Sequence, residues 1–213
     1  MPIILGLDLS LNSAGYFLFN TDNLEILEYG FIPNKDIDES EKILKIYNVI
    51  MGLFNKYKVD GVGIEEEFFF KSPSTLKNLS HVHGAALLAI AQSKIPYVYY
   101  SVLTAKSVTL SGFKTKHEDG TKKKGDELKQ EVAEEIFNMF GRDKFPKKVS
   151  LDITDAASIA WTYYKKDGKP IESAKKSKKL KKEKIEKTIK KDSEWVLFYI
   201  KFLFYKYLSL WYN

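Results

Sequence analysis

The sequence predicts an α/β fold, a mixed sheet of five strands with helices on both faces. Three observations lead to this prediction. Apolar stretches of strand length open the chain, helical spacing of apolar residues follows, and the later strands are separated by segments long enough for crossover connections. We therefore expect three antiparallel strands first and parallel strands after them.

The first three strands are separated by very short connections. They are predicted at residues 2–11, 15–20 and 24–32, where apolar and aromatic residues dominate. Residues 21–23, Thr-Asp-Asn, are predicted to form the second turn, and residues 10–14 the first. Connections this short join antiparallel neighbours, because parallel strands need a crossover of a dozen residues or more.

Helices and strands alternate in the next part of the chain. The apolar spacing predicts helix 39–57, strand 59–66, a helix over 76–89, strand 95–101, and helices 126–140 and 151–164. Residues 114–127 are polar and interrupted by glycines, which predicts a mobile loop before the helix that begins near 126.

Charge is distributed unevenly along the chain. Residues 165–213 hold 15 lysines and 6 acidic residues, whereas the formal net charge of the whole chain is only +6. We predict a folded domain over 1–164, a Lys-rich arm or linker over 165–194, and an apolar, aromatic segment over 195–213. Two lysines interrupt that last segment, so a membrane span is not expected.

The absence of cysteine excludes disulfides and thiolate metal sites, and it suits a protein of the cytoplasm. No basic region precedes the apolar start of the chain, so no secretory signal is expected. Lys, Ile, Phe, Tyr and Asn are abundant and Arg142 is the only arginine, a usage typical of an AT-rich genome. With the small size of the chain, we interpret this as a sign of a bacteriophage or another virus.

Acidic residues stand at three points that the predicted sheet would bring together. Asp8 lies in the aliphatic first strand, Glu65–Glu67 lie at the carboxyl end of the fourth strand, and Asp152 and Asp155 open the last helix. A buried carboxylate is costly unless it is paired, hydrogen-bonded or bound to a metal. Carboxylates from separate elements suit Mg²⁺ or Mn²⁺, and two such ions can promote hydrolysis of a phosphodiester.

Each acidic group also has an ordinary structural explanation. Asp8 could be a buried structural carboxylate, and the glutamates could be a solvated strand end. Asp152 and Asp155 could simply favour the positive end of the helix dipole. The combination in this order of elements carries more weight than any one of them.

Four separated blocks between about residues 3 and 164 resemble the RuvC-type Holliday junction resolvases of the ribonuclease H-like superfamily. They are LGLDLSLNSAGY, GIEEEFF, LKQEVAEEIF and DITDAASIAW. The resemblance implies a ribonuclease H-like fold and a homodimeric endonuclease that nicks four-way DNA junctions in pairs, with two Mg²⁺ ions (or Mn²⁺) per active site. It assigns the metal-binding catalytic carboxylates to Asp8, Glu65, Asp152 and Asp155.

The resemblance also implies residues that contact DNA. Lys106 resembles a family lysine near the scissile phosphate, and Lys129 resembles a family lysine that opens the helix before the catalytic one. Positive charge at these places would stabilise the negative charge that develops on the phosphate. Phe68 resembles an aromatic residue that stacks on bases at the junction. We add the lysines of the polar loop as candidate DNA contacts: Lys122, Lys123 and Lys124.

The helix over 76–89 is rich in alanine, and in the resembled family the corresponding helix pairs across the homodimer. His81 and His83 lie two residues apart and so face different sides of this helix. We interpret them as packing or interface residues and not as metal ligands. The loop 114–127 is longer than the family pattern implies, so its contacts to DNA are not carried over from the family. The basic and aromatic stretches from residue 165 onwards have no counterpart in that pattern.

Other functions remain open at this point. An actin-like or sugar-kinase ATPase would need a glycine-rich phosphate turn where this chain has Ser10-Leu11-Asn12. A ribonuclease H, an RNA-guided nuclease or a broader branched-DNA endonuclease would use the same carboxylates. In a different class, the basic tail could bind anionic membrane or DNA without catalysis.

Overall fold

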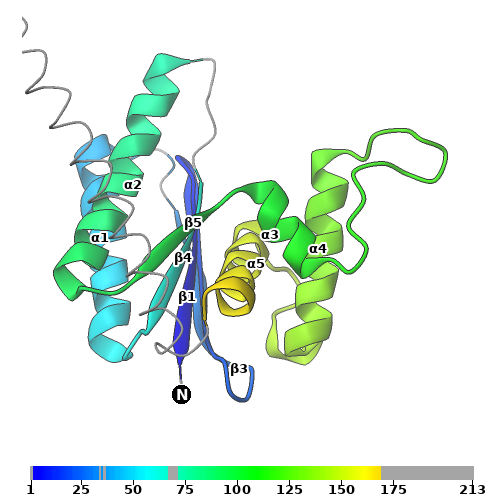
Figure 1. Ribbon diagram of the computed structural model, residues 1–213. Coiled ribbons are helices and arrows are strands. Elements are labelled where there is room, and N and C mark those ends of the chain that lie inside the picture. The colour runs from blue at the N-terminus through cyan, green and yellow to red at the C-terminus, as the bar shows by residue number, and fades with distance from the viewer. Residues whose placement is uncertain (1, 34, 36, 67–71, 169–213) are drawn as a thin grey trace, which may run out of the picture. The chain divides into compact units, whose positions relative to one another are not determined.

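The computed structural model describes residues 2–33, 35, 37–66 and 72–168 (Figure 1). Its five strands form one sheet in the order β3-β2-β1-β4-β5. Their bounds are β1 Ile3–Leu9, β2 Ser13–Asn20, β3 Glu25–Pro33, β4 Gly61–Glu65 and β5 Tyr97–Tyr100. β1, β2 and β3 pair antiparallel, whereas β4 is parallel to β1 and to β5. The predicted mixed sheet is therefore confirmed.

Helices lie on both faces of the sheet, as predicted (Figure 1). α1 (Glu39–Lys56) and α2 (Pro73–Ser93) cover one face, and α4 (Gly125–Phe140) and α5 (Leu151–Lys166) lie on the other. Each face has its own apolar core, built by alternate residues of the same strands. In β2, Leu18 packs towards α1, whereas Phe17 and Phe19 pack towards α5.

α5 lies unusually close to the sheet because glycines face it. A Cβ on Gly6 of β1 would come 2.0 Å from the carbonyl oxygen of Ala156, and one on Gly15 of β2 would come 2.0 Å from that of Asp152. Only glycine permits such an approach at these two positions. The contact places the first turns of α5 against the strand that carries Asp8.

One helix was not predicted. α3 (Val102–Thr109) follows β5 directly, and Ser101 caps it by accepting a hydrogen bond from the backbone N–H of Thr104. Its eight residues include four that are β-branched, so neither propensity nor periodicity marks a helix. The helix holds Lys106 against α5, with which α3 makes extensive contact.

The connections differ from the prediction in two details. Ser13 already belongs to β2 and Ala14 pairs with Leu9, so the first turn is shorter than the predicted 10–14. Within the loop 114–127, Lys116 and Lys122 form an antiparallel bridge, and α4 already begins at Gly125. The loop therefore contains a small hydrogen-bonded hairpin.

A 3₁₀ turn at Arg142–Lys144 joins α4 to the segment before α5. The Arg142 guanidinium donates hydrogen bonds to the carbonyl oxygens of Phe145 (3.4 Å), Pro146 (2.8 Å) and Lys147 (2.9 Å). It also lies over the ring of Phe137, 4.3 Å from the centroid. Arg142 thus stabilises the backbone conformation of the segment that leads into α5.

The first compact unit of the chain runs to Gly168 and contains all of these elements. Most of the predicted Lys-rich arm and the whole segment 195–213 lie outside the described residues. Among the helices that the structure describes, none is long and apolar enough to cross a membrane.

Candidate active site

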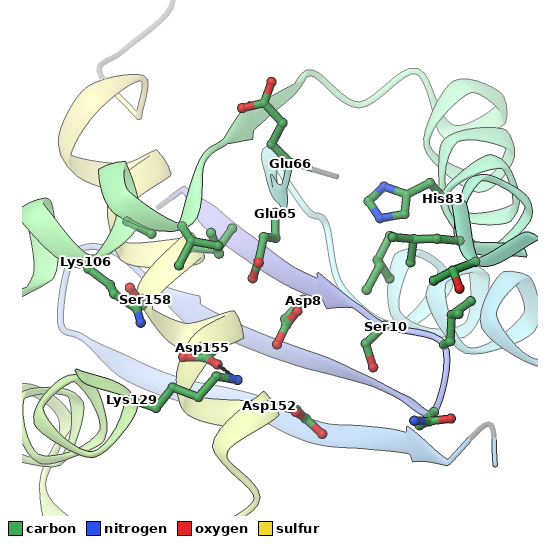
Figure 2. A pocket seen from close by; sticks show the side chains of 18 residues that line it. Asp8, Ser10, Glu65, Glu66, His83, Lys106, Lys129, Asp152, Asp155 and Ser158 are labelled. Carbon is green, nitrogen blue, oxygen red and sulfur yellow. Dashed lines mark ion pairs between the residues drawn. The ribbon is translucent and has the colours of Figure 1, made fainter. Parts of the chain in front are cut away.

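A cavity of about 420 Å³ opens at the carboxyl ends of β1 and β4, where α3, α4 and α5 come together (Figure 2). Parallel strands end at the same edge of a sheet, so residues far apart in the sequence converge there. The structure brings six of the predicted site residues to this cavity: Asp8, Glu65, Lys106, Lys129, Asp152 and Asp155.

Asp8 and Glu65 come from neighbouring strands and point toward one another (Figure 2). Asp8 exposes only 8% of its surface. Burial raises the pKa of Asp8 well above its usual range, and the charges of Glu65 and Asp155 raise it further. Burial and Asp155 likewise raise the pKa of Glu65.

Asp155 projects from α5 toward the same cavity and forms an ion pair with Lys129 of α4, with Nζ 2.6 Å from Oδ2. Burial raises the pKa of the Asp155 carboxyl, and the positive charges of Lys129 and Lys106 only partly oppose it. For Lys129 the balance is reversed. Burial lowers the pKa of its ammonium, but Asp155, Asp8 and Asp152 together raise it above its ordinary value. Lys129 is thus the main nearby positive charge for the carboxylates.

Asp152 is held by two serines. Ser13, on β2, donates its hydroxyl proton to Oδ2 of Asp152, and Ser150 donates to the same oxygen at 3.1 Å. Ser150 is also the N-cap of α5, and its hydroxyl accepts from the backbone N–H of Asp152. These contacts leave the other carboxylate oxygen of Asp152 available to the cavity.

Lys106 reaches the cavity from α3 with only 8% of its surface exposed. A buried hydrogen bond of 2.7 Å between the hydroxyls of Thr109 and Ser158 joins α3 to α5. The position of Lys106 relative to the α5 carboxylates therefore depends on this contact between the two helices.

The donor set fits a hard divalent cation, because it consists of carboxylate oxygens from separate elements and contains no sulfur. Burial, the largest cause in each case, raises the pKa of three of the carboxyl groups, so a cation in the cavity would stabilise their ionised forms. Within the described part of the chain, however, no three His, Asp or Glu side chains converge closely enough to hold a metal as they stand. Lys129 and the serines draw Asp155 and Asp152 to other partners, so metal binding would require these contacts to rearrange.

The remaining predicted residues are Phe68 and three lysines, and the lysines do not line this cavity. Phe68 lies outside the described residues. Lys122 and Lys124 are exposed in the 114–127 hairpin, and Lys123 forms an ion pair with Glu131 of α4. The structure does not bring these three lysines to the carboxylates.

The two histidines of α2 behave as packing residues. His81 pairs with Glu39 at the start of α1. His83 is buried and its ring stacks on Tyr99, with 6.1 Å between centroids. His83 also lines the far side of the cavity, away from Lys106 and Lys129 (Figure 2).

Sequence reasoning missed the residues that support the site. Ser150 stands directly before an apolar, helical run, a recognisable N-cap signal that predicts its location but not its bond to the Asp152 side chain. Ser13 and the pair Thr109–Ser158 carry no local signal, because their partners lie 139 and 49 residues away.

The sheet order and the acidic cavity at the ends of its central strands define the class, a ribonuclease H-like protein. A family model described as crossover junction endodeoxyribonuclease RuvC matches residues 4–163. The chain therefore belongs to the RuvC family, whose members are enzymes dependent on divalent metal ions.

Individual relatives agree with this placement. The chain is 30% identical over 162 residues to the RuvC of Aliarcobacter butzleri, a match that covers 75% of this chain and 96% of the relative. It is 32% identical over 97 residues to the RuvC of Treponema denticola, covering 44% of this chain and 54% of that one. The solved structure of T. thermophilus RuvC in complex with a Holliday junction substrate superposes with a TM-score of 0.63 at 18% identity, covering 79% of this chain and 97% of that chain. The structural match supports the shared fold.

Proposed function

We propose that this protein is a structure-selective DNA endonuclease that resolves four-way junctions by paired nicks, with hydrolysis of phosphodiester bonds at the cavity between β1, β4 and α5. The observation that carries the proposal is the convergence of Asp8, Glu65, Asp152 and Asp155 in one cavity of a RuvC-family chain. Two lysines, Lys106 and Lys129, line the same cavity.

The four carboxylates would hold Mg²⁺, or Mn²⁺ in its place, as two ions per active site. Bound there, such ions supply an activated water and stabilise the leaving oxygen of the phosphodiester. Asp8 suits the central ligand because it is buried between Glu65 and α5, where its ionised form lacks full compensation. Ser13 and Ser150 would orient the carboxylate of Asp152.

The lysines would act on the phosphate. Lys106 carries a buried positive charge at the wall of the cavity and has no carboxylate ion pair among the described residues. It would bind the scissile phosphate and stabilise negative charge as it develops there. Lys129 would exchange its contact with Asp155 for the phosphate once the carboxylates bind metal.

Paired nicks require two sites, so we propose that the active form is a homodimer. The solvent side of α2 offers a surface for close packing, where an added Cβ on Gly84 would meet nothing within 4 Å and where Leu88 is exposed. Lys122, Lys123 and Lys124 remain candidate contacts to the arms of the junction. We expect the protein to act in the cytoplasm. If its origin is viral, this would be the cytoplasm of the host cell.

A direct test uses a labelled synthetic four-way junction with Mg²⁺. The wild type is expected to release nicked duplexes, and Asp8→Asn is expected to bind the junction without cutting it. Asp22→Asn is the matched control, since Asp22 is an exposed aspartate in the turn after β2, at the opposite end of the sheet. It should cut as the wild type does.

The assignment fails if the wild type leaves the junction intact, or if Asp8→Asn cuts it equally well. Flaps and three-way junctions belong in the same assay. Cutting of these at the rate of the four-way junction would instead define a broader branched-DNA endonuclease that uses the same site.

A further inference from the structure

Phe31 is a large aromatic residue left uncovered on the α5 face of the sheet. It lies on β3, the edge strand next to β2, and 52% of its surface is exposed. The other aromatic residues on this face of β2 and β3 are covered. Phe17 and Phe19 are fully buried, and Tyr29 packs on Phe145 with 5.3 Å between ring centroids.

Phe31 shares a row of the sheet with the proposed catalytic residues. Asp8 pairs with Gly15, and Gly15 pairs with Phe31. Directly paired residues point to the same face, so Phe31 and Asp8 both face α5. Two strand spacings separate their Cα atoms by about 10 Å, which matches about three base steps along one DNA strand.

The surroundings of Phe31 are basic and open. Gly15, between Phe31 and Asp8, lies against Asp152 at the start of α5. The segment before α5 begins at Phe145, whose ring packs on Tyr29 of β3. It ends at Ser150, and the hydroxyls of Ser150 and Ser13 both donate to the carboxylate of Asp152. This segment therefore runs along the part of β3 that holds Phe31.

That segment carries two exposed lysines, Lys147 and Lys148. Arg142 fixes its backbone by hydrogen bonds to three consecutive carbonyls. Lys147 and Lys148 also line a hollow against α4. The segment therefore carries positive charge on the α5 side of the sheet, the side that Phe31 faces, and a phosphate backbone would follow such charge.

We propose that Phe31 is a stacking platform for a base of the DNA strand that leaves the catalytic cavity past the start of α5, with Lys147 and Lys148 following its phosphates. The proposal rests on the proposed function, since it assumes that the cavity cuts DNA. An exposed ring offers its face to any base, so the contact contributes affinity and position without selecting sequence. Phe31 is a positioning residue, because it touches the substrate away from the scissile phosphate.

The test measures junction affinity in the non-cutting Asp8→Asn background with Mg²⁺, by fluorescence anisotropy of a labelled four-way junction. Phe31→Ala is expected to raise Kd by about tenfold or more. Phe31→Tyr should keep the wild-type affinity, whereas Phe31→Leu should resemble Phe31→Ala because it preserves apolar surface without a ring. Leu44→Ala is the control, since Leu44 is equally exposed on α1, across the sheet.

A photo-crosslink locates the contact. 5-Iododeoxyuridine placed within about three base steps of the cleaved phosphate is expected to crosslink to the peptide that contains Phe31, and the crosslink should disappear in Phe31→Ala. Light scattering on the same variants reports whether the oligomeric state has changed.

Equal Kd values for Phe31→Ala and the parent protein would overturn the inference, as would full affinity in Phe31→Leu. A weaker affinity that accompanies a change of oligomeric state would identify Phe31 as a protein contact and would also overturn it. The wild type is assayed first for cutting. If it neither binds nor cuts the junction, the proposed function itself fails, a result distinct from failure of the Phe31 variants alone.

Discussion

Asp8 is a carboxylate whose ionised form opposes folding. Its pKa in the folded chain is raised by burial, then by Glu65 and Asp155, so ionisation at neutral pH costs stability. This cost is present above the folded-state pKa and disappears as pH falls below the unfolded-state value near 4. A site prepared for a cation is therefore destabilising while the cation is absent.

We predict that Asp8→Asn stabilises the metal-free protein. At pH 8 in EDTA the free energy of unfolding should rise by about 1 kcal/mol or more, since one pKa unit corresponds to that much, and the gain should vanish below about pH 4. Urea denaturation across this pH range measures it. Mg²⁺ should then raise the Tm of the wild type but not that of the variant, whereas an equal response of both proteins to Mg²⁺ would contradict the role of Asp8.

Among individual side chains, the carboxylates of the site were predictable from the sequence, whereas the residues that hold them were not. Asp8 interrupts an apolar strand and Glu65 ends one. Because burying a carboxylate costs free energy, a carboxylate at such a position indicates a function. Ser13 is an ordinary serine in a turn sequence, and only the fold brings it to Asp152. The ion pair of Lys129 with Asp155 was likewise invisible, although both residues were already predicted to belong to the site.

Among the elements, α3 is the one that sequence periodicity did not predict, and it positions a site residue. Its eight residues form barely two turns, so its helicity depends on packing against α5 more than on its own propensity. The hydrogen bond between Thr109 and Ser158 is a buried polar part of that packing. The position of Lys106 thus depends on a contact made one turn away from it.

We predict that Thr109→Val lowers kcat for junction cleavage by up to about 100-fold, because small misplacement of a charged group has effects of this size. Stability should fall by only about 1 kcal/mol. Thr162→Val is the control, because its hydroxyl is also buried but bonds the Ser158 carbonyl within α5. It should cost similar stability and leave kcat unchanged. Equal kcat losses in the two variants would show that α3 has no special part.

Across the whole molecule, the approach of α5 to the sheet fixes the geometry of the site. The strand order and the two-sided cover of helices were predictable, because they follow from the order of apolar segments and from crossover rules. The close approach of α5 to the sheet was not predictable, since a glycine in a strand indicates only that some other part of the chain packs closely against it. Which helix approaches, and that it carries Asp152 and Asp155, emerges from the packing.

We predict that Gly6→Ala destabilises the protein by about 3 kcal/mol or more, because the new methyl group would overlap the α5 backbone. It should also lower cutting activity in the fraction that remains folded. Gly52→Ala is the opposite control, since Gly52 is an exposed residue of α1 and an added Cβ there meets nothing within 4 Å. That change should raise stability by about 0.5–1 kcal/mol. Urea titrations of both variants measure the difference, and a neutral Gly6→Ala would contradict the close packing.

The place of Arg142 has a consequence for how this enzyme can read DNA. A guanidinium that grips the O6 and N7 atoms of guanine is the commonest base-specific contact in protein–DNA recognition. The chain has a single guanidinium, and it is engaged with three backbone carbonyls and an aromatic ring. Apart from histidine, all other basic residues of the chain are lysines, whose ammonium groups interact with phosphates as point charges. Any preference for particular bases at the cut is therefore not expected to come from an arginine reading guanine. It would come from other side chains at the base edges, or from the ease with which a sequence bends or unstacks.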